Sequence, residues 1–196
     1  SAVSGNELDR AFWGQYNGMR NQDVFGILNL DYSRRDASTG TWLDIVGNNL
    51  GLQTREIGLK WTRQGDWGLG ADYNELWRVN PYTVNTAVQG TGTTTPSAQY
   101  LFGGPGTGGD TELSTKRKSF GINGSKQFGP EYLLDAKVSS EKKTGAQLFG
   151  IGNLCPGATS TGCSFTPGST AGFGVLYYPL PIDYTHTQVD ARLTYS

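Results

Sequence analysis

The sequence predicts an all-β fold: an antiparallel up-and-down transmembrane β-barrel, with about seven strands in this chain and its long loops on one side. Three observations favour this fold. Apolar and polar residues alternate with a period of two along most of the chain. Short turns that contain glycine or proline separate many of the alternating runs. No segment shows a helical periodicity of useful length, so we expect no βαβ unit.

Seven segments carry the alternation, in chain order 23–33, 42–48, 55–62, 67–74, 119–125, 132–139 and 188–195. The segment 55–62 is typical: Ile57, Leu59 and Trp61 fall on one face. Glu56 and Lys60 fall on the other face, because successive strand residues point to opposite sides. The segment 42–48 shows the weakest alternation of the seven.

The connections predict how the strands are joined. Four are short enough for hairpins, which makes neighbouring strands antiparallel: 37–40, 48–52, 64–66 and 128–131. Two are long, at about 80–112 and 145–182. Counting strands up and down places both long loops on the side of the N-terminus, unless a further strand lies between Ala11 and Met19. We therefore divide the chain into an N-terminal segment, 1–22, and the first strands of a barrel, 23–196.

Composition excludes several classes of protein. The chain has 196 residues, of which 12% are aromatic, and a net charge of -1, which argues against disorder. With 16 basic and 17 acidic residues intermixed, there is no basic surface for nucleic acid, and we expect no nucleic-acid partner. The sequence contains no apolar run of the ~20 residues that a transmembrane helix requires.

A soluble β-sandwich also alternates, so the pattern alone leaves that fold open. The longest alternating run, 23–33, has about 11 residues, which matches a tilted membrane strand better than the ~5–6 residues of a soluble one. In a barrel, one set of residues would face lipid: Leu28, Leu30, Ile57, Leu59, Trp61, Leu69, Tyr73, Ile122, Leu134, Val189 and Leu193. The opposite set would face a wet lumen or a partner within it: Asn29, Asp31, Glu56, Lys60, Asp72, Asn74, Asp135, Lys137, Asp190 and Arg192.

Aromatic residues gather near the ends of the runs, where girdles at the lipid–water boundary are expected. They are Tyr32, Trp42, Trp61, Trp67, Tyr73, Trp77, Tyr132 and Tyr195.

The residues offer little chemistry of their own. Cys155 and Cys163 enclose a loop rich in Gly, Thr and Ser, for which a local disulfide is the expected state in an oxidising compartment. A haem or metal role is the alternative, but the sequence has no Cys-x-x-Cys-His motif and a single histidine, His186. We expect no enzyme activity, no metal site and no cofactor bound by this chain. Lys116, Arg117 and Lys118 are expected to be a solvated strand end, with contact to anionic lipid head groups as the alternative.

Three blocks of sequence are distinctive. They are GQYNGMR at 14–20, WLDIVGNNLGLQTRE at 42–56 with its continuation to WTRQGDW at 61–67, and LPIDYTHTQ at 180–188 leading into VDARL. These blocks resemble the MtrB/PioB family of outer-membrane barrels, and the likeness extends from Phe12 to Tyr195.

The resemblance implies a bacterial outer-membrane porin that sheathes a multihaem c-type cytochrome and supports electron transfer across the membrane. It also implies outer-membrane lipid as a partner, and haem held by the cytochrome. The family's barrels are several times longer than this chain, and about seven strands cannot close around a folded protein, so we expect the N-terminal part of a larger barrel. The alternatives are a general diffusion porin or small barrel with no cytochrome, and a soluble secreted β-sandwich that binds a partner.

Overall fold

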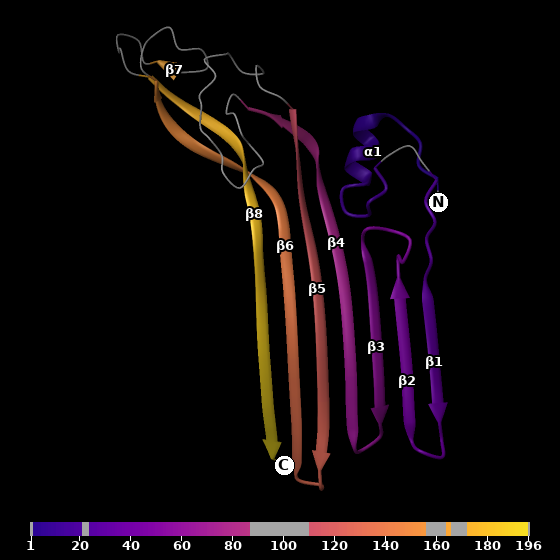
Figure 1. Ribbon diagram of the computed structural model, residues 1–196. Coiled ribbons are helices and arrows are strands. Elements are labelled where there is room, and N and C mark those ends of the chain that lie inside the picture. Colours follow the sequence, from indigo (N-terminus) through magenta and orange to yellow (C-terminus); the bar gives the residue numbers. More distant parts are fainter. Residues whose placement is uncertain (1, 21–23, 87–109, 156–163, 166–171, 196) are drawn as a thin grey trace. The chain divides into compact units, whose positions relative to one another are not determined.

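A computed structural model describes residues 2–20, 24–86, 110–155, 164–165 and 172–195, with side chains over 2–20, 24–86, 110–150 and 177–195. Within these residues lie one helix and eight strands (Figure 1). They are α1 (Glu7–Trp13), β1 (Leu30–Asp36), β2 (Thr41–Asn48), β3 (Arg55–Arg63), β4 (Trp67–Asn85), β5 (Asp110–Phe128), β6 (Tyr132–Cys155), β7 (Ser164–Phe165) and β8 (Gly172–Tyr195).

The strands form one sheet in the order β1-β2-β3-β4-β5-β6-β8-β7. Apart from the two-residue β7, this is an open meander of seven antiparallel strands. The all-β antiparallel prediction is therefore confirmed. The sheet is not closed within the described residues, as expected of part of a barrel.

The predicted turns join consecutive strands. Gly40, Gly65 and Gly129 have φ values of 65°, 70° and 63°, a left-handed conformation that glycine adopts without a steric penalty. Asn49, with φ 54°, begins the connection from β2 to β3, and asparagine is among the residues that tolerate this conformation. Local backbone preference thus places the reversals where the sequence predicts them.

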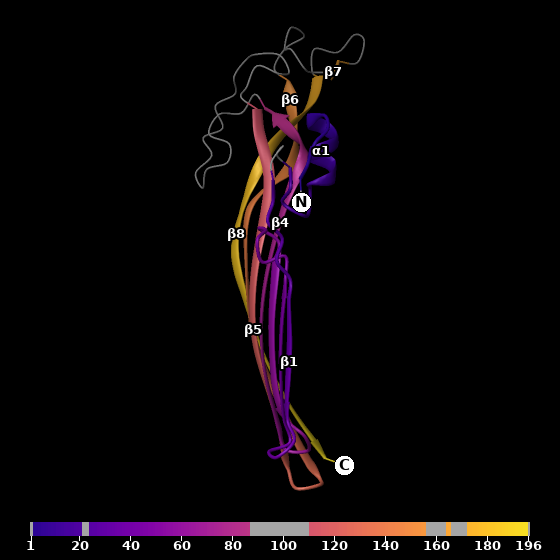
Figure 2. The same ribbon diagram turned by 90° about the vertical axis from the view of Figure 1, so that its right-hand side faces the viewer.

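The chain divides into two compact units. The first comprises Ser1–Arg78, Lys116–Lys143 and Asp183–Ser196. Its strands lie side by side in a single layer, which Figure 2 shows edge-on. The second unit comprises Val79–Thr115 and Thr144–Ile182. There Val79 and Leu113 are buried, and the rings of Phe149 and Tyr178 meet edge to face at 5.6 Å.

Four strand boundaries differ from the sequence prediction. The first strand begins at Leu30 rather than residue 23, so Leu28 and Asn29 precede it. The predicted loops at 80–112 and 145–182 are too long, because β4 extends to Asn85, β6 extends to Cys155 and β8 begins at Gly172. These strand ends are rich in glycine, proline and polar residues and lack a clean apolar alternation, so periodicity did not reveal them.

The N-terminal segment contains a helix that the periodicity did not predict. Asn6 caps α1 by accepting a hydrogen bond from the Asp9 backbone N–H at 2.8 Å, and Gly14 closes it with a bond to the Arg10 carbonyl. The helix has seven residues, too few for a periodic signal. Residues 11–19 form helix and turns, so the additional strand considered there is absent.

The segment after α1 lies against the part of β4 beyond the end of β3. Because Arg55 of β3 pairs with Glu75 of β4, β3 does not cover the next residues of β4. There the Arg78 guanidinium lies 5.3 Å from the centre of the Tyr16 ring, and the Thr54 hydroxyl donates to the Tyr16 carbonyl at 2.9 Å. The segment therefore contacts a strand edge that would otherwise lie open.

Candidate functional site

The candidate site is the pair of unlike faces that the first unit presents. Strand register defines them, because residues directly opposite in antiparallel strands share a face. Ile57 pairs with Tyr73, Leu59 with Ala71 and Trp61 with Leu69. We call the side that carries these residues the apolar face.

The apolar face extends across β2 and β1. Ile45 pairs with Leu59, and Leu43 with Trp61. On β1, Tyr32 pairs with Ile45 and Leu30 with Gly47, which places both on the same side. Large apolar side chains are exposed on this face, including Leu59 at 40% and Leu69 at 48%. A single layer offers them no second sheet to pack against.

The same face continues over β5, β6 and β8. A Cβ atom placed on Gly124 would stand 3.4 Å from Leu69 Cδ2, so Gly124 and, by alternation, Ile122 share the apolar face. The Tyr132 and Tyr195 rings lie 5.1 Å apart, and the Ser140 and Thr187 hydroxyls 3.3 Å apart, so these alternate positions of β6 and β8 lie on one side. Leu134, Val189 and Leu193 have the same parity and are exposed, Val189 by 71%.

The opposite side, which we call the polar face, carries the charged residues. The Ser33 hydroxyl donates to Asp44 at 2.6 Å, and the Asn74 amide donates to Glu56 at 3.0 Å. Register places further residues on this face: Asp31 beside Val46, Asp44 beside Lys60, and Gly58 beside Asp72. Charges of both signs thus occur on this face, and Lys60 lies directly opposite Asp44.

Glycines let polar side chains lie close to the sheet here. A Cβ atom on Gly70 would stand 2.5 Å from Asn123 Oδ1, and one on Gly121 would stand 2.6 Å from Asp72 Oδ1. A larger residue at either position would push these side chains away from the sheet. These contacts also place Asn123 and Gly121 of β5 on the polar face.

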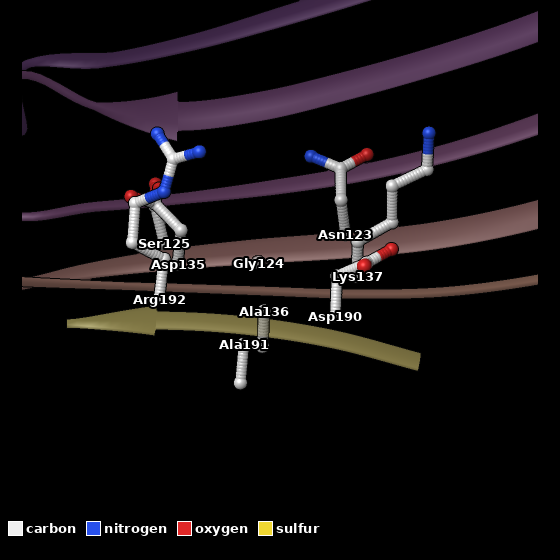
Figure 3. A pocket seen from close by; sticks show the side chains of 9 residues that line it. All are labelled: Asn123, Gly124, Ser125, Asp135, Ala136, Lys137, Asp190, Ala191 and Arg192. Carbon is white, nitrogen blue, oxygen red and sulfur yellow. The ribbon is translucent and has the colours of Figure 1, made fainter. Parts of the chain in front are cut away.

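A shallow hollow lies on this face over β5, β6 and β8 (Figure 3). At one end Ser125, Asp135 and Arg192 lie together, and at the other end Asn123, Lys137 and Asp190 do. Ala136 and Ala191 point to the opposite side of the sheet. The acidic and basic side chains of neighbouring strands therefore face each other in alternating order.

Two groups of residues depart from the predicted faces. Trp42, expected in an aromatic girdle, lies on the polar face opposite Arg35, whose guanidinium lies 4.7 Å from its ring centre. Leu28 and Asn29 bind the β2–β3 connection, where the Leu28 carbonyl accepts from the Leu50 N–H at 3.0 Å and Asn29 Oδ1 accepts from the Asn49 N–H at 2.9 Å. Neither of these two residues is part of a two-faced strand.

Aromatic pairs lie on the apolar face near the tight turns. The Trp61 and Trp67 rings meet edge to face at 5.0 Å, and Tyr132 lies against Tyr195. All four residues have apolar-face parity. They lie at the turn end of the strands. Their place in a girdle at the lipid–water boundary stays a prediction.

A charged cluster lies at the other end of the apolar face. Glu75, with a side chain only 2% exposed, receives Arg55 Nε on Oε2 at 2.9 Å and Lys116 Nζ on Oε1 at 2.5 Å. The Tyr73 hydroxyl donates to Oε2 at 3.1 Å. Sequence reasoning missed this cluster because its charged members, Arg55, Glu75 and Lys116, lie 20 or more residues apart and meet only through the strand register.

A comparison with known protein families gives a match over nearly the whole chain. The family described as "Putative outer membrane beta-barrel porin, MtrB/PioB" matches residues 6–196. The chain belongs to the MtrB/PioB family. The comparison with curated proteins found no match. Family membership confirms the resemblance, and it places the chain in an outer membrane as part of a β-barrel porin.

Membership in a porin family suggests a non-enzymatic role. In the described part of the chain, no cluster of three or more His, Cys, Asp or Glu side chains is arranged to hold a metal ion. No helix there is long and apolar enough to cross a membrane. The predicted disulfide falls outside the described residues, because Cys163 and the side chain of Cys155 are not among them.

Proposed function

We propose that this MtrB/PioB chain forms part of the wall of a porin that sheathes a multihaem c-type cytochrome and supports electron transfer across the outer membrane. In this proposal the apolar face contacts lipid and the polar face lines the lumen and meets the guest protein. The chain itself acts as a scaffold without catalysis and binds no cofactor, since the haem belongs to the cytochrome.

The observation that carries the proposal is the contrast between two faces of one layer of strands. An exposed apolar surface of this extent indicates contact with a membrane or a partner. β3 has nine residues from Arg55 to Arg63, and both charged ends point to the apolar face with only uncharged residues between them on that face. A tilted strand needs about nine to eleven residues to cross the hydrocarbon. The nine residues from one charged end of β3 to the other therefore match the length of a membrane span.

The polar face suits a protein guest. Asp135, Lys137, Asp190 and Arg192 present both signs in alternation, so the wall has no strong single-sign field of the kind that selects small ions. Glycines let Asn123 and Asp72 lie close to the sheet, so their side chains project less into the lumen. This leaves space for a large folded partner.

Co-purification tests the proposal. The full-length protein would carry an affinity tag and be purified in mild detergent from outer membranes of cells that make c-type cytochromes. We expect a haem-staining protein and a Soret absorption band to follow the tag. A variant that removes the four charges lining the hollow should lower the amount of haem recovered. It combines Asp135→Asn, Lys137→Gln, Asp190→Asn and Arg192→Gln. Lys126→Gln, near a turn, should not change the recovery.

The alternative has its own signature. A folded barrel that conducts ions in planar bilayers but carries no haem under these conditions would contradict the sheath and favour a general diffusion porin. The soluble sandwich is not proposed further, because the strands form one sheet and the family is an outer-membrane one.

A further inference from the structure

We propose that Arg55, Lys116 and Lys118 form a binding site for the phosphate group of an anionic lipid at the edge of the apolar face. The inference rests on the lipid contact proposed above for that face, and it does not depend on a cytochrome.

Register and contacts place all three cations on the apolar face. Arg55 lies directly opposite Glu75, in the same row of alternate residues as Ile57 and Tyr73. Lys116 reaches Glu75 Oε1 at 2.5 Å, so it points to this side as well. Lys118 follows two residues later on the same strand and is exposed. Arg117, between them, pairs instead with Glu141 at 4.0 Å.

Glu75 holds two of the cations in place. Each carboxylate oxygen binds one of them, and the carboxylate lies beneath them with a side chain only 2% exposed. Arg55 binds Glu75 through Nε, a contact that does not use its two terminal amino groups, and its side chain is 40% exposed. The three cations and one carboxylate carry a net charge of +2. A cluster that is already ordered loses little side-chain entropy when it binds an anion.

The position of the cluster favours a lipid over a free anion. It lies where the uncharged stretch of the apolar face ends, which is the depth at which head-group phosphates meet a membrane protein. A phosphate attached to acyl chains would bind the cations while its chains cover Ile57, Leu59 and their neighbours. At the turn end, by contrast, Arg63 and Lys126 both pair with Asp66, and aromatic rings take the boundary position.

Native mass spectrometry of the full-length protein in detergent tests the site. The probes are phosphatidylglycerol and phosphatidylcholine with identical acyl chains, and inorganic phosphate. We expect preferential retention of phosphatidylglycerol, and Arg55→Gln with Lys118→Gln should weaken that retention about tenfold, since each basic residue near a membrane surface contributes to anionic-lipid binding. Phosphatidylcholine retention should not change.

The matched control removes two charges from the same two strands on the polar face, by Lys60→Gln with Arg117→Gln, and should leave retention unchanged. Lys118→Gln alone keeps the Glu75 cluster intact and should give a smaller loss, which separates binding from misfolding.

Equal retention in the double variant and the unmodified protein would overturn the site, as would an equal loss in the polar-face control. Complete competition by millimolar inorganic phosphate would overturn the lipid as its ligand. Lipid selectivity without recovered haem would leave the site in place and contradict only the sheath.

Discussion

At the scale of single residues, neighbours in the chain meet different surroundings. Leu59 and Lys60 are adjacent on β3, yet Leu59 pairs with Ala71 on the apolar face and Lys60 with Gly70 on the polar face. Substitutions of these two neighbours should therefore have different effects on membrane assembly. That difference tests whether each face contacts lipid or water.

Arginine on the apolar face should impair membrane assembly. We expect Leu59→Arg or Leu193→Arg to cost ~2–4 kcal/mol if these residues lie near the middle of the bilayer, because a charge must be moved into hydrocarbon. Lys60→Gln and Arg192→Gln should be tolerated. Urea-dependent folding of the full-length protein into lipid vesicles measures the difference, and equal tolerance on the two faces would contradict the assignment.

The buried carboxylate of Glu75 should contribute to stability. Glu75→Gln leaves Arg55, Lys116 and the Tyr73 hydroxyl without their anionic partner. Hydrogen bonds to charged groups contribute roughly 1.5–3 kcal/mol each, and the partial exposure of both cations places the expected loss near the lower end, at about 1–2 kcal/mol. Urea unfolding in detergent measures it.

Glu56→Gln provides the control for that measurement. Glu56 lies next to Arg55 in the chain but on the polar face, in an exposed contact with Asn74. Its substitution should change stability by less than about 0.5 kcal/mol. A similar loss in both variants would mean that the Glu75 cluster has no special role.

At the scale of elements, the β3–β4 turn is tied to the end of β5. The Asp66 carbonyl accepts from the Gln127 N–H at 2.7 Å, and its carboxylate binds Lys126 and, at 3.5 Å, Arg63. The hydrogen bond from Lys126 lowers the pKa of the Asp66 carboxyl below its ordinary value. Burial acts in the opposite direction, and the charges of Lys126 and Arg63 add to the lowering. The turn is therefore an electrostatic link between two hairpins.

This link should weaken in acid. Because the folded-state pKa of Asp66 lies below the unfolded value of about 3.9, its stabilisation is complete above that pH and is lost as the pH falls toward the folded-state pKa. We expect the Gln127 amide to lose hydrogen-exchange protection below about pH 4. Asp66→Asn should show the reduced protection already at pH 7, with little further pH dependence. An unchanged protection factor in Asp66→Asn would contradict the link.

The sequence was most informative for the first unit. Alternation predicted both faces of β3 and β4, and glycine-bearing turns predicted the reversals, because both signals are local. It was less informative where structure depends on distant residues. The extended ends of β4, β6 and β8 carry no clean alternation, α1 is too short for a helical pattern, and Trp42 faces the polar side because of its register with Thr62. The Glu75 cluster could be recognised only once that register was known.

At the scale of the whole molecule, the open sheet leaves the backbone groups at its edges without partner strands in the described residues. β1 bonds to β2 on one side only, and the opposite edge of the meander is likewise unclosed within the described residues. In lipid each unpaired backbone group costs several kcal/mol, so a membrane sheet must pair both edges. Further strands of the same polypeptide or of another copy would satisfy the requirement.

Hydrogen exchange of the full-length protein in lipid vesicles tests this. The β1 amides that point away from β2 should exchange as slowly as those bonded to β2, since a neighbouring strand would cover both sets. The amides of the exposed turn at 37–40 provide the fast reference. The contrary outcome is exchange of the outward β1 amides at the rate of the turn while the apolar face stays in the membrane. In that case β1 would be a true edge. The sheet would then lie on the membrane or against a partner without closing into a barrel.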